Sequence, residues 1–201
     1  MILCDREVLA AISRKAIRIT PLPDPDGWSS TALDLTLAAK LQVWRELSGK
    51  GAEVVINPRS RDFNVTALAD EHTSEESCAG SNGYHLRPGG FVLGWTVQKI
   101  QLPHTSRIAA RVEGKSSLAR LGLGVHITAP TIHAGFGYRE AEPGFPGNPI
   151  QLEIWNFGPL TIKLTEGLPI CQLILEEVHG TPDQGYKGQF ALQGPDVASG
   201  H

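Results

Sequence analysis

The sequence predicts a mainly β domain, a barrel or jelly roll with a few short helices. Apolar runs with period-two alternation recur through the second half of the chain, and such runs between turn residues are typical of all-β folds. Glycine (22 residues) and proline (14 residues) punctuate these runs, as many short strands require. With 201 residues, the chain is long enough to bury a core as one domain over residues 1–201.

Helical signals are few and fall at two places. Asp5 is the expected N-cap of an amphipathic helix over residues 5–16, because a short polar side chain accepts hydrogen bonds from the first free amides. A second helix of one or two turns is expected to begin at Ser116 or Ser117 and to end at Gly122. Both are short additions to the predicted sheet.

The strands are expected at six places. They span residues 91–100, 107–113, 124–129, 150–156, 160–164 and 170–178. The polar, glycine-rich stretch 73–83 and the stretch 137–149, which holds three prolines and three glycines, are expected to be surface loops. Residues from about 180 to 201 are expected to form a C-terminal lid or tail.

Composition and missing motifs exclude several classes of function. The net charge is −3 without a lysine or arginine run, so a nucleic acid polymer is not an expected partner. No apolar stretch is long enough to span a membrane, and the N-terminus carries acids instead of a signal peptide, so a cytoplasmic location is expected. Cys4, Cys78 and Cys171 form no C-x-x-C pair, which disfavours a disulfide framework or a thiolate zinc site.

The zinc nucleobase deaminases need H-x-E followed by P-C-x-x-C to hold the metal and move protons. Neither motif occurs in this chain. The phosphate-binding G-x-x-x-x-G-K-[ST] loop, the G-x-S-x-G elbow and the H-E-x-x-H zinc motif are also missing. What remains is a concentration of polar residues among glycines in "VEGKSSLARLGLGVHITAPTIHAGFG", followed after the proline-rich loop by "IQLEIWNFG".

Those two stretches resemble a known family. "GKSSLARLGLGVHITA" is similar to the signature of dCTP deaminases, and "LEIWNFG" resembles their catalytic strand. "LCDREV", "STALDLTL", "HLRPGGFVLGWTVQKIQLP", "LTEGLPICQLILEEV" and "YKGQ" follow in the family's order, so the likeness covers almost the whole chain. The resemblance implies a distorted jelly-roll or β-clip barrel of the dUTPase type and a homotrimer with sites shared between neighbouring subunits.

The strand "IQLEIWN" carries a carboxylate with two interpretations. Its apolar residues alternate toward one face, which places Glu153 on the opposite face together with Gln151. An exposed strand carboxylate is the ordinary interpretation, whereas the resemblance implies that Glu153 is the general acid/base. One carboxylate can both activate water for attack on cytosine C4 and deliver the proton to the leaving ammonia.

The resemblance also implies the other members of the site. Ser116 and the backbone carbonyl of Ala129 would position the water, while Arg120 would steady Glu153 and the developing charge. Lys115, Ser116 and Ser117 would hold triphosphate oxygens, although a helix cap on a surface loop is the alternative. The expected nucleotide-binding set is Lys115, Ser116, Ser117, Arg120, Thr128, Ala129, Ile132, His133, Gln151, Tyr186, Lys187 and Gln189.

Several members of this region keep an ordinary structural alternative. His126 is expected on a strand beside the site, as a supporting residue that does not bind the ligand, because lone histidines in strands are more often structural than ligands. Thr128 has cross-strand packing as its structural alternative, whereas the backbone of residues 129–132 is the expected edge that reads cytosine. Tyr186, Lys187 and Gln189 would close over the phosphates as a lid, or belong to a disordered tail.

The chain departs from the family pattern at three places. His133 stands where the family and dUTP pyrophosphatases usually have an aspartate that contacts the deoxyribose 3′-hydroxyl. A neutral imidazole still accepts a hydrogen bond but supplies no fixed negative charge, which disfavours hydrolysis of the phosphate chain. Residues 139–149 replace a short turn, and Gly185 replaces a phosphate-binding lysine, for which Lys187 is a substitute.

The resulting hypothesis is zinc-independent deamination of dCTP to dUTP and ammonia, with Mg²⁺ carried by the triphosphate and no metal site in the protein. A bifunctional enzyme that continues to dUMP is the first alternative, and a pure dUTP pyrophosphatase is the next. A non-catalytic sensor that binds dCTP, dUTP or dTTP belongs to a different class, and His133 and the insertion motivate it. Inhibition by dTTP stays open.

Overall fold

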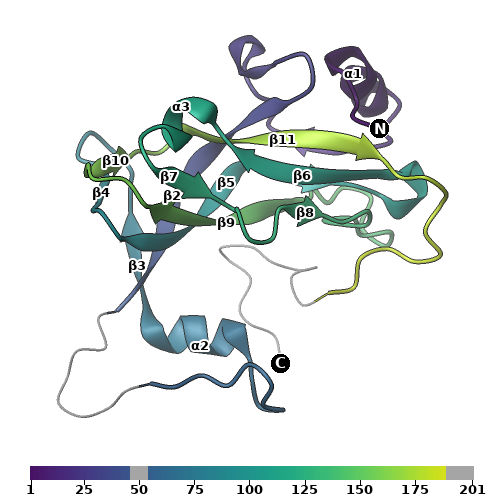
Figure 1. The fold of residues 1–201 in the computed structure, drawn as a ribbon. Coiled ribbons are helices and arrows are strands. Elements are labelled where there is room, and N and C mark those ends of the chain that lie inside the picture. The colour runs from purple at the N-terminus through teal and green to yellow at the C-terminus, as the bar shows by residue number, and fades with distance from the viewer. Residues whose placement is uncertain (46–53, 189–201) are drawn as a thin grey trace.

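The computed structural model describes residues 1–45 and 54–188, and its main feature is a curled antiparallel sheet (Figure 1). The prediction of a mainly β fold with few helices is confirmed. The main sheet has the order β7-β9-β5-β2-β11-β6-β8, while β1 pairs with β5, β3 pairs with β2, and β4 and β10 form a separate pair. The strands are β1 Arg18–Thr20, β2 Leu33–Trp44, β3 Thr73–Ser77, β4 Tyr84–Leu86, β5 Phe91–Gln101, β6 Ile108–Gly114, β7 Leu123–Val125, β8 Thr131–Ile132, β9 Asn148–Asn156, β10 Ile162–Leu164 and β11 Pro169–Glu177.

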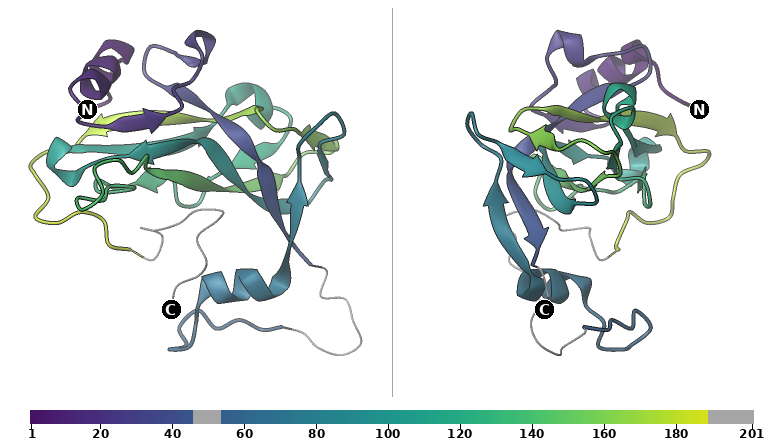
Figure 2. Two further views of the ribbon diagram at one scale, coloured as in Figure 1. Left: turned by 180° about the vertical axis from the view of Figure 1, so that it is seen from behind. Right: turned by 60° about the vertical axis from the view of Figure 1, so that its left-hand side comes forward.

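The sheet curls because its two ends pack against each other across the core. Strands β6 and β7 are in contact although they are not hydrogen-bonded neighbours. Figure 2 shows this curvature, with β11 and β6 lying over β5 and β9. Register shifts in the β2–β5 and β5–β9 pairs mark bulges, which bend strands and increase their twist.

The core lies inside the curl and follows the alternation of the strands. The sheet's central strand β2 buries Leu33, Leu35 and Leu37 completely, whereas Asp34 and Thr36 between them are only half-buried. The fully buried large side chains are Leu33, Leu35, Leu37, Leu41, Leu86, Ile100, Leu102, Leu123, Ile150, Leu152, Ile154 and Leu164. Burial of this apolar area is the main force that holds the sheet in its curled form.

The described residues contain three α-helices outside the sheet, α1 Asp5–Ser13, α2 Val65–His72 and α3 Ser116–Ala119. Helix α1 buries Val8 and Ala11 against the core. Helix α2 lies on an arm that extends from β2 and β3 away from the body (Figures 1 and 2), and none of its residues is buried. None of the helices in the described residues is long and apolar enough to cross a membrane.

Four local predictions need correction. The N-cap of α1 is Cys4, with its amide donating to Glu7 Oε2 at 2.9 Å, so Asp5 is the first helical residue. Helix α3 starts at Ser116 with Lys115 as its N-cap. The expected loop 73–83 contains β3, because those polar residues pair with β2. The expected strand 124–129 ends at Val125, because the next residue has a left-handed backbone.

Candidate active site

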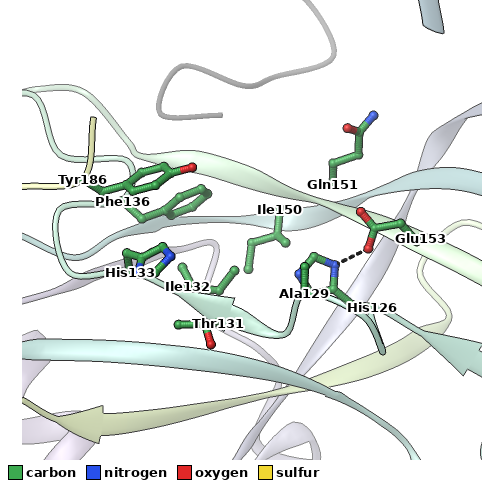
Figure 3. A pocket seen from close by; sticks show the side chains of 10 residues that line it. All are labelled: His126, Ala129, Thr131, Ile132, His133, Phe136, Ile150, Gln151, Glu153 and Tyr186. Carbon is green, nitrogen blue, oxygen red and sulfur yellow. Dashed lines mark ion pairs between the residues drawn. The ribbon is translucent and has the colours of Figure 1, made fainter. Parts of the chain in front are cut away.

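A pocket of about 200 Å³ opens between β8, β9 and the loop that follows β7. Its floor is apolar, since Ile132, Phe136 and Ile150 are all buried. Polar side chains stand around this floor (Figure 3). The residues that line the pocket are His126, Ala129, Thr131, Ile132, His133, Phe136, Ile150, Gln151, Glu153 and Tyr186.

The acidic end of the pocket is an ion pair between Glu153 and His126. Oε2 of Glu153 lies 2.7 Å from Nδ1 of His126 (dashed line in Figure 3). Within the described part of the chain, neither atom has a hydrogen-bond partner elsewhere. The imidazole is 8% exposed and the carboxylate side chain 35%, so the pair is sheltered on one side and open to the pocket on the other.

Sheet pairing explains why these two residues meet. Val125 at the end of β7 pairs with Ile154 of β9, and the chain continues the contact with a bond from the His126 amide to the Glu153 carbonyl at 2.9 Å. His126 then takes a left-handed conformation with φ 53°, which ends the strand. The expectation that His126 lies on a strand beside the site needs correction, because β7 ends at Val125 and His126 lines the pocket directly.

Gln151 occupies the same face of β9 as Glu153. Its Nε2 donates to Gln42 Oε1 of β2 at 3.0 Å, which fixes the amide beside the pocket. The predicted alternation holds along this strand, with Leu152 and Ile154 buried and Gln151 and Glu153 half-buried. Amide and carboxylate thus reach the pocket from one rigid strand.

The opposite end of the pocket is a pair of stacked rings. His133 and Tyr186 have ring centroids 5.1 Å apart and an interplanar angle of 16°. The Tyr186 amide donates to the Ala134 carbonyl at 3.1 Å. Gly135 has φ 101°, and a Cβ there would lie 2.2 Å from the Tyr186 nitrogen, so only glycine lets the C-terminal segment cross this turn.

The predicted phosphate and water ligands on α3 lie outside this pocket. Ser116, Ser117 and Arg120 are exposed on the surface. Lys115 is half-buried, and its Nζ donates to Asp34 Oδ2. Within one copy of the chain, the structure therefore does not bring α3 together with Glu153.

Six of the predicted site residues line the pocket, namely Ala129, Ile132, His133, Gln151, Glu153 and Tyr186. Thr128 and Lys187 are exposed and lie outside it, and Gln189 lies outside the described residues. Sequence reasoning missed Thr131, Phe136 and Ile150 as lining residues. Thr131 falls within the 129–132 backbone edge that was expected to read cytosine, whereas no sequence signal marked the two apolar residues.

The insertion after His133 folds on itself and lies beside the pocket. Arg139 pairs with Glu142 at 3.1 Å, and its guanidinium lies 3.8 Å from the Phe145 ring centroid. The Phe145 carbonyl accepts from Arg18 Nη1 at 2.9 Å and from Gln101 Nε2 at 3.2 Å. These contacts anchor the loop to β1 and β5, and none of its residues lines the pocket.

Comparisons with known proteins agree on one family. A family model described as dCTP deaminase-like matches residues 2–178. A dCTP deaminase of Rhodospirillum rubrum is 34% identical over 203 residues, covering 95% of this chain and 94% of the relative. A dUMP-forming dCTP deaminase of Methanosphaera stadtmanae is 31% identical, covering 98% of this chain and 92% of the relative.

A solved structure supports the fold independently. The 2′-deoxycytidine 5′-triphosphate deaminase from Agrobacterium tumefaciens matches with a TM-score of 0.61 at 20% identity, over 89% of this chain. This chain spans about half (48%) of that solved chain's length. The family model covers most of the described residues, including α3 and every pocket-lining residue except Tyr186, and the chain therefore belongs to the dCTP deaminase-like family.

Proposed function

We propose that this protein deaminates dCTP, in the form of its Mg²⁺ complex, to dUTP and ammonia. The observation that carries the proposal is a half-buried carboxylate, Glu153, that faces an apolar pocket beside a buried imidazole. Such a pocket accepts a flat pyrimidine, and the polar groups at its edge orient the ring. Relatives named dCTP deaminase, which cover almost the whole chain, support the same assignment.

The reaction needs one water, and Glu153 carries the protons. The carboxylate takes one proton from the water as the water oxygen bonds to cytosine C4, and it passes this proton to ring N3. It then takes the proton of the new C4 hydroxyl and passes it to the amino group as the C4–N bond breaks. Water and dCTP thus become dUTP and ammonia. The Ala129 carbonyl at the pocket edge is the proposed acceptor that holds the water.

Zinc independence is part of the proposal. Its support is the missing H-x-E and P-C-x-x-C pair in the sequence, which zinc nucleobase deaminases use to hold the metal. The carboxylate and the positioned water then do the work that a metal-bound hydroxide does in those enzymes. Mg²⁺ enters with the triphosphate as part of the substrate.

We further propose that a neighbouring copy of the chain completes the site, as in a homotrimer. The pocket of about 200 Å³ is smaller than the ~300–1,000 Å³ of typical ligand sites, so it holds the nucleoside and leaves the phosphates outside. Ser116 at the start of α3 and Arg120, its C-cap, are exposed and can reach a neighbour's site. There Ser116 would hold the water and Arg120 would steady Glu153.

An exposed apolar patch next to α3 supports this association. It consists of Leu121, Ile127, Phe157 and Leu160, with exposed fractions between 44% and 64%. Ile127 and Phe157 both lie against Gly124 of β7, since a Cβ there would contact both side chains. Exposed apolar clusters on soluble proteins mark association surfaces, and this one adjoins the helix that the shared site needs.

The proposed triphosphate ligands are Lys115, Ser116 and Ser117 from the neighbour, with Tyr186, Lys187 and Gln189 of the C-terminal segment. Lys115 is paired with Asp34, which also accepts from Gln172 Nε2 at 3.1 Å. Its ammonium therefore has to share its charge between this carboxylate and a phosphate.

A cytoplasmic location, where deoxynucleoside triphosphates are made and used, belongs to the same proposal.

A second candidate is the bifunctional reaction that continues from dCTP to dUMP. The observation that favours it is the likeness to relatives from Methanosphaera stadtmanae and Halobacterium salinarum, both named dUMP-forming dCTP deaminases. His133 argues against it, since an imidazole supplies no fixed negative charge to activate a water at the phosphates. A sensor that binds dCTP, dUTP or dTTP without turnover is the remaining alternative.

Product analysis separates these candidates. Purified protein is incubated with dCTP and Mg²⁺, and nucleotides and ammonia are quantified. We expect dUTP and ammonia in equal amounts; dUMP with pyrophosphate indicates the bifunctional enzyme, and tight binding without turnover indicates the sensor. Addition of dTTP tests whether this nucleotide inhibits the reaction. A zinc-selective chelator should leave the rate unchanged.

Replacement of Glu153 tests the proposed acid/base directly. Glu153→Gln keeps the shape of the side chain but removes the group that accepts the proton, so we expect no measurable ammonia release. Because the amide still fits the pocket, dCTP affinity should stay within about tenfold, or ~1.4 kcal/mol. Undiminished turnover by this variant contradicts the mechanism.

A further inference from the structure

The pocket is lined by opposite kinds of groups at its two ends. Among the described residues that line it, Glu153 alone carries a carboxylate, and that group pairs with His126. The other end consists of the stacked rings of His133 and Tyr186 (Figure 3). This end, which we name the ring wall, has no fixed negative charge.

The ring wall is held in place by the backbone. Tyr186 is bonded through its amide to Ala134, and the close passage over Gly135 leaves no room for the segment to shift toward the turn. Gly185 adds a second contact, because a Cβ there would lie 3.2 Å from His104 Nδ1. Tyr186 therefore offers His133 a fixed stacking partner.

The orientation of the substrate places the sugar at this wall. With cytosine C4 at Glu153, as the proposed function requires, the base lies over the apolar floor and the sugar points toward His133 and Tyr186. Deoxyribose in dCTP has one free hydroxyl group, at C3′. That hydroxyl meets an imidazole and a phenol instead of a carboxylate.

The charge and the exposure of the group at the wall decide how strongly the enzyme requires the 3′-hydroxyl. Hydrogen bonds to ionised groups are roughly twice as strong as those between neutral groups, so a carboxylate would favour the hydroxyl much more than a neutral imidazole does. His133 is also exposed, so water replaces a missing hydroxyl and no buried group loses its partner. Strong rejection of an analogue needs such an unpaired buried group.

We propose that the ring wall contacts the sugar without requiring its 3′-hydroxyl, and that the substrate class of this enzyme extends to cytosine nucleotides that lack or modify that group. His133 is then a specificity-determining residue. The inference rests on the proposed function, because it uses the orientation of the base toward Glu153. It goes further by assigning a sugar tolerance to this chain.

The test compares dCTP with 2′,3′-dideoxycytidine triphosphate. For the unmodified enzyme we expect kcat/KM for the two nucleotides to agree within about tenfold, which corresponds to ~1.4 kcal/mol. His133→Asp places a carboxylate at the wall, and we expect the preference for dCTP to rise by a further factor of about ten or more. His133→Asn remains neutral and should keep the original ratio within about threefold.

A matched control separates local charge from net charge. His85→Asp makes the same substitution at an exposed histidine on β4, outside the pocket, and should leave the ratio unchanged. A ratio above about 100 in the unmodified enzyme overturns the inference. Equal changes of this ratio in His133→Asp and His133→Asn also overturn the inference, because they indicate that the loss of stacking, and not the added charge, changes the preference.

Equilibrium binding of both nucleotides to the catalytically silent Glu153→Gln variant distinguishes this inference from the proposed function. If the unmodified enzyme does not deaminate dCTP but the variant binds both nucleotides with similar affinity, the proposed reaction fails and the sugar tolerance stands. If dCTP is deaminated and the dideoxy analogue binds more than 100-fold more weakly, the sugar tolerance fails alone. Thermal melting of each variant verifies that it is folded.

Discussion

At the scale of single residues, the contact between His126 and Glu153 fixes the position of the carboxylate in the pocket. The carboxylate is fixed on β9, and the buried imidazole approaches it from the end of β7 at 2.7 Å. In the proposed mechanism His126 would be a positioning residue, since it contacts Oε2 of Glu153 and leaves the other oxygen for the reaction. Placement of the reacting group matters, because errors of about 1 Å can reduce a rate about 10²-fold.

Substitution of His126 should change turnover more than binding. Asparagine tolerates the left-handed backbone that His126 adopts, but its shorter side chain does not reach Glu153. For His126→Asn we expect kcat to fall by about 10²-fold while KM changes little, measured by steady-state ammonia release. Equal effects on kcat and KM would indicate general disruption of the pocket instead of lost positioning.

The buried cysteine Cys171 on β11 should make the folded state less stable as the pH becomes alkaline. Burial raises the pKa of its thiol, and Asp34 adds to the shift. Because the folded state favours the neutral thiol, this contribution is complete below the unfolded pKa of about 8.5 and is lost as pH rises toward the folded pKa. Denaturant unfolding between pH 8 and 10.5 should show a steeper loss of stability for the unmodified chain than for Cys171→Ala.

At the scale of elements, the turn after β8 and the C-terminal segment form one unit. Gly135 and Tyr186 pass so closely that a side chain at the glycine cannot be accommodated. The segment that carries Tyr186 is therefore part of the described pocket, although the sequence alone left it as a lid or a tail. Residues 189–201 lie outside the described residues.

Gly135→Ala tests this crossing, with Gly89→Ala as its control. Both glycines have positive φ, but a Cβ at Gly89 meets open space, whereas at Gly135 it meets the Tyr186 backbone. Both variants should lose about 1–2 kcal/mol of stability from backbone strain. Gly135→Ala alone should also speed hydrogen exchange of the Tyr186 amide and raise KM for dCTP.

At the scale of the whole molecule, the proposed catalytic groups come from two distant surfaces. Glu153 faces the pocket, while Ser116 of α3 and the C-cap residue Arg120 are exposed beside the apolar patch. A homo-oligomer with closed symmetry can repeat one such contact at every site. This arrangement predicts that two different inactive variants complement each other.

Complementation is measured by mixing Glu153→Gln and Arg120→Ala chains under conditions that exchange subunits. Each parent should be nearly inactive. In an equal random mixture, about one site in four combines an intact Glu153 with an intact Arg120 from the neighbour, so about a quarter of full activity should return. If no activity returns although mass measurements show mixed oligomers, the sites are not shared.

The sequence by itself determined the β class, the family and the places of six strands of the described residues, β5, β6, β7, β9, β10 and β11. The central strand β2 was not among the predicted ones. Alternation placed Leu152 and Ile154 in the core and Glu153 on the other face, because side chains in a strand alternate whatever the rest of the fold does. Of the residues predicted from the motifs "GKSSLARLGLGVHITA" and "LEIWNFG", Ala129 and Glu153 line the pocket. These are local signals, carried by neighbours in the chain.

Only the tertiary structure decided which residues meet. His126 reaches Glu153 because β7 pairs with β9 in one register and the backbone turns left-handed at the strand end, and neither event is written in local propensity. The stack of His133 on Tyr186 joins residues 53 positions apart through a passage over Gly135. Long-range pairing and close packing depend on the whole fold, so one face of a strand can be predicted from sequence, whereas the partner opposite it cannot.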